Sequence, residues 1–99
     1  MRIRVYVTKK NLREGQPSDG SHCAVKKALD RYFTKVAGVG RETAQFDPYG
    51  SRPKRINLPE SVKEKILQYD RLKRSVKPFS FVLDVPKRFV RAAYQCKSA

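Results

Sequence analysis

Residues 79–85, FSFVLDV, limit the fold more than any other segment because large apolar side chains recur at every second position. A period of two is typical of a β-strand with one buried face. Ser80 and Asp84 fall on the opposite, solvent-facing side, and Pro86 ends the strand. Residues 2–8, RIRVYVT, alternate in the same way. The sequence therefore predicts one half-buried strand near each end of the chain.

Two helices are predicted between these strands. The first covers residues 21–35, where apolar residues as far as Val36 follow the i, i+3, i+4, i+7 spacing of one helix face. Gly38 and Gly40 are expected to stop it. The second covers residues 59–73 and begins at a proline, whose missing N–H needs no partner at a helix start.

Shorter elements are predicted around these helices. Thr8 can cap a helical turn over residues 9–14, which Gly15 would end in a left-handed conformation. In the centre, residues 41–46 and 54–58 are predicted as two strands, joined by a turn rich in Pro, Gly and Ser. Apolar residues at helical spacing near the C-terminus predict a short terminal helix.

Together these elements predict an α+β fold, with a small mixed or antiparallel sheet of three to four strands packed against two main helices. A chain of 99 residues has room for one domain with one modest core. We therefore expect a single basic α+β domain over residues 1–99. Residues 86–99 are expected to form a C-terminal extension that is either helical or flexible.

The charge of the chain indicates an anionic partner. There are 23 Lys and Arg residues against 9 Asp and Glu residues, which gives a formal net charge of +14. Such an excess repels itself in the folded state and is typical of proteins that attract polyanions, most commonly nucleic acid. Because residues 39–60 are close to neutral and both flanking thirds are basic, the charge is not a separate tail. Solubility alone is the alternative explanation.

The first candidate contact surface is a row of cations on the first predicted helix. Lys27, Arg31 and Lys35 recur every four residues and are expected to line up on its solvated side. Cations about one turn apart can follow a phosphate backbone and release its counterions. A plain solvated helix face is the alternative.

The second candidate surface is the polar side of the N-terminal strand. Arg2, Arg4 and Tyr6 alternate with its apolar residues. If this side is open, two guanidinium groups beside a phenol could bind phosphate and stack on a base. In the alternative, Tyr6 belongs to the core and the arginines discourage pairing between strand edges.

The third candidate surface consists of basic residues on either side of the last strand. Whether the two clusters converge depends on where the terminal helix docks. A tail that orders on its partner and passive solubility are the alternatives. The residues are Lys73, Arg74 and Lys77 before the strand, and Lys87, Arg88 and Arg91 after it.

No residue pattern indicates catalysis, a metal or a cofactor. His22 and Cys23 are adjacent, and adjacent side chains on a helix point about 100° apart, which is poor geometry for a nucleophile and its base. The two cysteines, Cys23 and Cys96, form no C-x-x-C motif, and nothing supports a disulfide between them. We expect a protein that is not an enzyme and has no metal, cofactor or small-molecule substrate.

Nothing in the sequence indicates a membrane partner. No segment reaches the about 18 apolar residues that span a bilayer, and the N-terminus lacks the continuous apolar stretch of a signal peptide. We therefore expect a cytoplasmic protein.

Two segments carry a recognisable order of features. Residues 5–29 contain a strand, Val-Thr, a helical turn, Gly, a polar loop, Cys and an Ala-rich helix, and residues 58–86 contain Leu-Pro, a helix ending in Tyr-Asp, and Val-Lys-Pro-Phe-Ser-Phe. Together they resemble a group of short bacteriophage and prophage proteins of mostly unknown function. In departure from the pattern, Ala24 stands where a Pro is often found, and the basic tail after Pro86 is unusually long. The resemblance implies an accessory phage protein, and such proteins include inhibitors of host defence, anti-CRISPR proteins among them.

The leading hypothesis combines this resemblance with the charge. It is a phage-encoded protein that docks through a basic surface on host nucleic acid or a host nucleoprotein, for example a CRISPR effector, and excludes target nucleic acid sterically. A generic DNA- or RNA-binding regulator is the second class, although no zinc-finger, basic-zipper or RNA-recognition motif is present. A small virion-associated structural protein, which would oligomerise and co-purify with particles, is the third.

Overall fold

The two ends of the chain meet in an antiparallel ribbon of two strands, β1 (Arg2–Val7) and β5 (Phe79–Asp84). The computed structural model describes residues 1–17 and 19–95. Alternate side chains of both strands share one buried face, so both predicted terminal strands are confirmed with the predicted faces. The ribbon joins segments that are nearly the whole chain apart and therefore closes the fold.

A short helix, α1 (Lys9–Glu14), follows β1 directly. Thr8 caps it as predicted: its hydroxyl accepts a hydrogen bond from the Asn11 N–H at 3.2 Å, and the Asn11 side chain accepts one from the Thr8 N–H at 3.0 Å. The predicted left-handed conformation of Gly15 is wrong, because its φ is −71°. Glycine is needed here for space, since a Cβ would lie 2.5 Å from the nitrogen of Ala24.

The second helix, α2 (Ala24–Tyr32), is shorter than the sequence predicts. It begins after Cys23, whose sulfur accepts a hydrogen bond from the Lys26 N–H at 3.4 Å. It ends where Phe33 forms an antiparallel bridge with Val90 near the other end of the chain. Local periodicity carries no information about such a distant contact, so the sequence pattern extends the helix too far.

After α2 the chain enters a strand that the sequence pattern does not predict, β2 (Val36–Val39). Val36 continues the apolar period of the helix, but α2 has already ended at Tyr32, and Lys35 has a φ of 60°, outside the helical region. Val36 is buried, as the helical pattern predicts, but it lies in a strand and not on a helix face. Gly38 lies within this strand and Gly40 follows it, so the prediction that they stop a helix is wrong.

A three-stranded antiparallel sheet occupies the centre of the sequence. β2 pairs with β3 (Thr43–Phe46), which pairs with β4 (Lys54–Asn57), and these confirm the two strands predicted there. α3 (Glu60–Arg71) follows, with Pro59 at its start as predicted. The α+β class is thus confirmed, with two separate antiparallel sheets of two and three strands in place of one sheet.

Two 3-10 turns, Lys87–Phe89 and Ala92–Tyr94, stand where the spacing predicts a terminal helix. The long-range bridge holds Val90 in an extended conformation between them, which prevents a continuous helix. Phe89 is only 2% exposed, and its ring stacks on that of Phe46 with 5.2 Å between centroids. This part of the predicted extension therefore contributes to the core.

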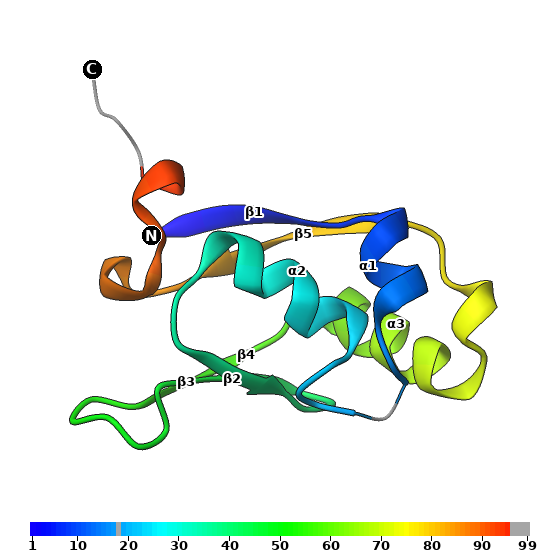
Figure 1. Cartoon of the computed structure of the whole chain (residues 1–99), viewed down its shortest axis with the longest axis horizontal. Helices are drawn as coiled ribbons and strands as arrows, with labels where there is room; N and C mark the ends of the chain where they lie inside the picture. The colour runs from blue at the N-terminus through cyan, green and yellow to red at the C-terminus, as the bar shows by residue number, and fades with distance from the viewer. Residues whose placement is uncertain (18, 96–99) are drawn as a thin grey trace.

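The elements pack in layers around one hydrophobic core (Figure 1). α2 lies between the β1–β5 ribbon and the β2–β3–β4 sheet. α1 and a 3-10 turn at Lys73–Ser75 lie at one end of the long axis, while the β3–β4 hairpin and the C-terminal 3-10 turns lie at the other. The last residues of the predicted extension, Cys96 included, lie outside the described residues.

Candidate nucleic-acid interface

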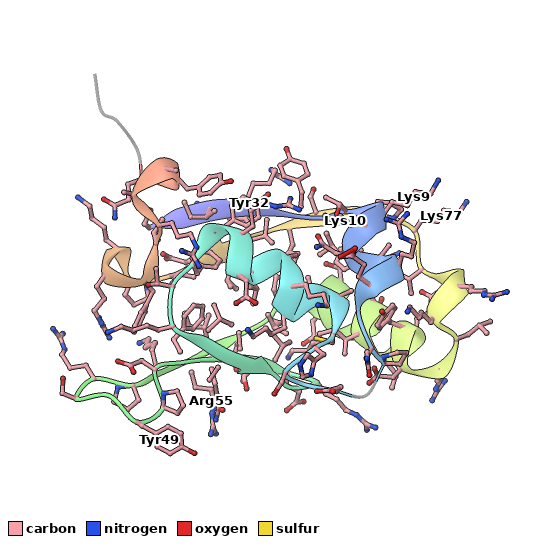
Figure 2. All side chains as sticks on the ribbon, viewed as in Figure 1. Lys9, Lys10, Tyr32, Tyr49, Arg55 and Lys77 are labelled. Atoms are coloured by element: carbon pink, nitrogen blue, oxygen red, sulfur yellow. The ribbon has the colours of Figure 1, made fainter. Side chains whose placement is uncertain are left out.

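An open groove lined by cations lies between α1 and the segment that links α3 to β5, and we call it the α1 groove. Its volume is about 590 Å³. Figure 2 shows Lys9 of α1 and Lys77 of the linking segment projecting side by side at this end of the molecule. The groove has no Asp or Glu in its lining, which consists of Lys9, Leu12, Arg13, Lys73, Arg74, Val76, Lys77 and Pro78.

Two hydrogen bonds hold α1 against α3 and the linking segment. The Tyr69 hydroxyl of α3 donates to the Leu12 carbonyl at 2.9 Å, and the Lys73 ammonium donates to the Arg13 carbonyl at 2.7 Å. Both carbonyls belong to the last turn of α1, where no helical N–H is available to them. Burial raises the pKa of Tyr69 to about 12, so its hydroxyl remains a donor at neutral pH.

No Asp or Glu is among the lining residues of the α1 groove. Five ion pairs between described residues include none of its cations. Its apolar floor includes Leu12 and Val76, which are buried. Cationic walls above an apolar floor suit a ligand that carries both phosphates and flat ring systems. The ion pairs join the Met1 amino group to Asp84, His22 to Asp19, Lys26 to Asp30, Lys35 to Asp47 and Lys63 to Glu60.

The first predicted surface, Lys27, Arg31 and Lys35, is not a row on one helix face. Lys27 and Arg31 lie on α2, where Lys27 is half-buried and Arg31 is exposed, with its guanidinium 5.8 Å from the ring centroid of Tyr32. Lys35 lies beyond the end of α2 and pairs with Asp47 at 3.7 Å. The prediction of three aligned cations is therefore wrong, because the helix ends before the third.

The second predicted surface, Arg2, Arg4 and Tyr6, lies together on the outer face of the ribbon. All three side chains are exposed, and Tyr6 is 53% exposed. A guanidinium nitrogen of Arg4 donates to the Ser80 hydroxyl at 3.2 Å. The alternative in which Tyr6 belongs to the core is excluded, so this face is open to a partner.

The two halves of the third predicted surface do not converge. Arg74 and Lys77 line the α1 groove, whereas Lys87, Arg88 and Arg91 follow the far end of β5. A strand of six residues spans about 20 Å, which keeps the two clusters apart.

Two of the three C-terminal cations make contacts that hold the tail in place. Arg88 donates to the Arg52 carbonyl at 3.1 Å, and its guanidinium lies 4.5 Å from the ring centroid of Phe89. Arg91 donates to the carbonyl of Asp30, in the last turn of α2, at 2.9 Å. Lys87 is exposed.

Sequence reasoning misses two residues of the α1 groove, Lys9 and Arg13. They stand four positions apart on the helical turn predicted for residues 9–14, which is a signal for a shared helix face. What the sequence does not reveal is that this turn packs beside residues 73–77, because that placement depends on the contact between Tyr69 and α1.

Cys23 and His22 do not form a nucleophile–base pair. The Nδ1 atom of His22 lies 3.0 Å from a carboxylate oxygen of Asp19, and Cys23 is buried at the start of α2. Burial raises the pKa of the Cys23 thiol, which disfavours the reactive thiolate. In the part of the chain that the structure describes, no three His, Cys, Asp or Glu residues are grouped to hold a metal ion. No helix in that part is long and apolar enough to cross a membrane.

Comparisons with protein-family models, with curated proteins and with solved structures give no match to this chain. The resemblance to short phage proteins therefore stays a prediction.

Proposed function

We propose that this chain is a binding protein that docks on nucleic acid, free or within a nucleoprotein, through the α1 groove. The observation that carries the proposal is the grouping of five cations without a carboxylate in one open groove. Phosphates that enter such a groove exchange their condensed counterions for Lys and Arg side chains, and the released ions favour binding. The open outer face of the ribbon, with Arg4 and Tyr6, is a second contact surface for the same kind of ligand.

The resemblance to phage proteins supports a particular partner. A host nucleoprotein such as a CRISPR effector holds a channel for target nucleic acid, and a small basic protein that occupies the phosphate path excludes the target sterically. In this form of the proposal the chain is phage-encoded, acts in the host cytoplasm as an inhibitor of host defence, and catalyses no reaction. It binds the path of the backbone, so it needs no base-specific contact.

A charge-reversed variant tests the α1 groove. In Lys9→Glu/Arg74→Glu/Lys77→Glu all three positions are exposed, so the fold is expected to persist. Loss of three phosphate contacts lowers the slope of log affinity against log salt by about 2 to 3, which corresponds to an affinity loss of about 100-fold at 0.15 M salt. Fluorescence anisotropy with labelled single and double strands measures both quantities, and circular dichroism checks the fold.

The matched control is Lys27→Glu/Arg31→Glu/Lys35→Glu, which changes the net charge equally but alters the α2 region. It is expected to lose much less affinity than the groove variant. Equal losses in the two variants would mean that binding follows net charge alone and would contradict the α1 groove. Pull-downs from host lysate with and without nuclease then separate free nucleic acid from a nucleoprotein, and a chain that captures neither contradicts the proposal.

A further inference from the structure

The tip of the β3–β4 hairpin presents a tyrosine to solvent. Tyr49 is fully exposed, and its side chain takes part in no hydrogen bond, ring stack or cation–π contact with any described residue. In contrast, the ring of Tyr94 lies 4.7 Å from that of Tyr32. A ring that packs on nothing adds no buried area to the fold, so Tyr49 has no structural role.

The turn that carries Tyr49 has a fixed shape. The Asp47 N–H donates to the Lys35 carbonyl at 2.8 Å, and the Gly50 N–H donates to the Asp47 carbonyl at 3.0 Å. A Cβ on Gly50 would meet the carboxylate of Asp47, which shows how closely the Asp47 side chain folds back over the turn. Prolines on either side of the tip fix the backbone further. The backbone that carries Tyr49 is thus already ordered, so a ligand that binds the ring has little backbone entropy to remove.

Three exposed cations lie on the same hairpin as this ring. Arg52, Lys54 and Arg55 follow it in the sequence, and Figure 2 shows Tyr49 and Arg55 projecting from the same side of the hairpin. The carboxylate of the turn, Asp47, is paired with Lys35. The local charge is therefore positive and complements a phosphate backbone.

We propose that the hairpin tip is a stacking site for an unpaired nucleobase, which makes single-stranded nucleic acid the class of ligand. This inference rests on the proposed function. The ring of Tyr49 stacks on one base while Arg52 and Arg55 contact the flanking phosphates. Bases inside a duplex already stack on their neighbours, so a duplex offers this ring no free face. The elements that line the α1 groove, α1 and the segment after α3, lie at the opposite end of the long axis from the hairpin tip, so the two sites can be altered independently (Figure 1).

A tryptophan reporter tests the stacking directly. The chain contains no Trp, so Tyr49→Trp places a single indole at the tip. Titration with a thymidine oligonucleotide is expected to quench its fluorescence, because stacked bases quench indole emission. Inorganic polyphosphate, which has charge but no bases, is expected to bind the protein without comparable quenching of the indole fluorescence. Unchanged emission when the oligonucleotide saturates the protein overturns the inference.

Affinity measurements with two further variants separate the ring from its hydroxyl. Tyr49→Ala is expected to lower single-strand affinity by about 5- to 100-fold with an unchanged salt slope, whereas Tyr49→Phe retains the stacking face and stays within about twofold. Duplex affinity is expected to change little in either variant. Equal losses on single strands and duplex indicate a backbone contact and overturn the inference.

The outcomes also distinguish this inference from the proposed function. If single-strand binding depends on the α1 groove but not on Tyr49, the inference fails and the proposed function stands. If the wild-type chain binds neither nucleic acid nor a nucleoprotein, both fail. Tyr49-dependent capture of a nuclease-treated protein assigns the tip to a protein partner and likewise overturns the inference.

Discussion

The two cationic ends of the last strand differ in what their side chains contact. Before β5, Arg74 and Lys77 line the α1 groove and take part in no ion pair with a described residue. After β5, Arg88 and Arg91 donate to backbone carbonyls of other segments. Lys and Arg side chains thus line a groove before β5, whereas after β5 they attach the C-terminal segment to the rest of the fold. The number of cations in a segment does not by itself locate a binding site.

The difference follows from which backbone groups need partners. The last carbonyls of a helix have no N–H within that helix, so a nearby guanidinium that donates to them is used by the fold. Arg91 does this for α2. At the α1 groove the buried hydroxyl of Tyr69 and the ammonium of Lys73 satisfy two such carbonyls, which leaves the remaining cations for a ligand.

The substitution with the largest expected effect on stability moves α1, one wall of the groove, without changing the net charge. Gly15→Ala places a methyl group 2.5 Å from the Ala24 nitrogen and 2.8 Å from the Tyr69 hydroxyl, so α1 has to shift. We expect the free energy of unfolding to fall by about 1–3 kcal/mol, with weaker nucleic-acid binding because one wall of the groove moves. Urea denaturation and anisotropy measure the two effects.

Gly40→Ala is the matched control, because a Cβ there meets only the Thr43 carbonyl oxygen at 3.7 Å. Its unfolding free energy is expected to stay within about 0.5 kcal/mol of the wild type, with unchanged binding. A Gly15→Ala variant as stable as this control would show that α1 is not fixed by its contact with α2.

A smaller effect is expected from Tyr69→Phe, which removes the hydrogen bond between α3 and the Leu12 carbonyl. The expected loss of unfolding free energy is about 1–2 kcal/mol at pH 7. The pKa of Tyr69 is raised to about 12 in the folded protein, above its ordinary value of 10.0. Between these values the unfolded chain has lost a proton that the folded chain keeps, so wild-type stability falls as pH rises.

Denaturation of both proteins from pH 7 to pH 11 checks this expectation. The stability advantage of the wild type over Tyr69→Phe should be constant at neutral pH and should shrink above pH 10. An advantage that is constant throughout this range would contradict the raised pKa.

The sequence predicts the elements with a local signal better than those set by distant contacts, for a physical reason. β1 and β5 follow from a period of two, and the cap of α1 from the Thr8 side chain, because each of these signals lies within its own segment. The end of α2 coincides with the bridge between Phe33 and Val90, and β2 is formed by pairing with β3. Such a pairing leaves no trace in local spacing.

The same limit applies to the candidate site. Charge patterning identifies Arg74 and Lys77, which do line the α1 groove. It also selects Lys35, which the backbone places after α2 and beside Asp47. Tyr49 stands in a segment of nearly neutral charge, where a search guided by net charge does not look. Its exposure at the hairpin tip becomes evident only in three dimensions.

The smallest expected effects come from single substitutions at the two ends of β5, which should change either stability or nucleic-acid binding. Arg91→Ala removes a donor from the Asp30 carbonyl, so the free energy of unfolding is expected to fall by about 0.5–1.5 kcal/mol. Lys77→Ala, in the groove, is expected to stay within about 0.5 kcal/mol of wild-type stability and to lower the salt slope of binding by about 0.7–0.9. Lys87→Ala, a neighbour of Arg91 that is exposed, controls for the loss of one charge in the tail. If Arg91→Ala lowered the salt slope as much as Lys77→Ala while stability stayed unchanged, Arg91 would belong to the ligand and the contrast between the two ends would be wrong.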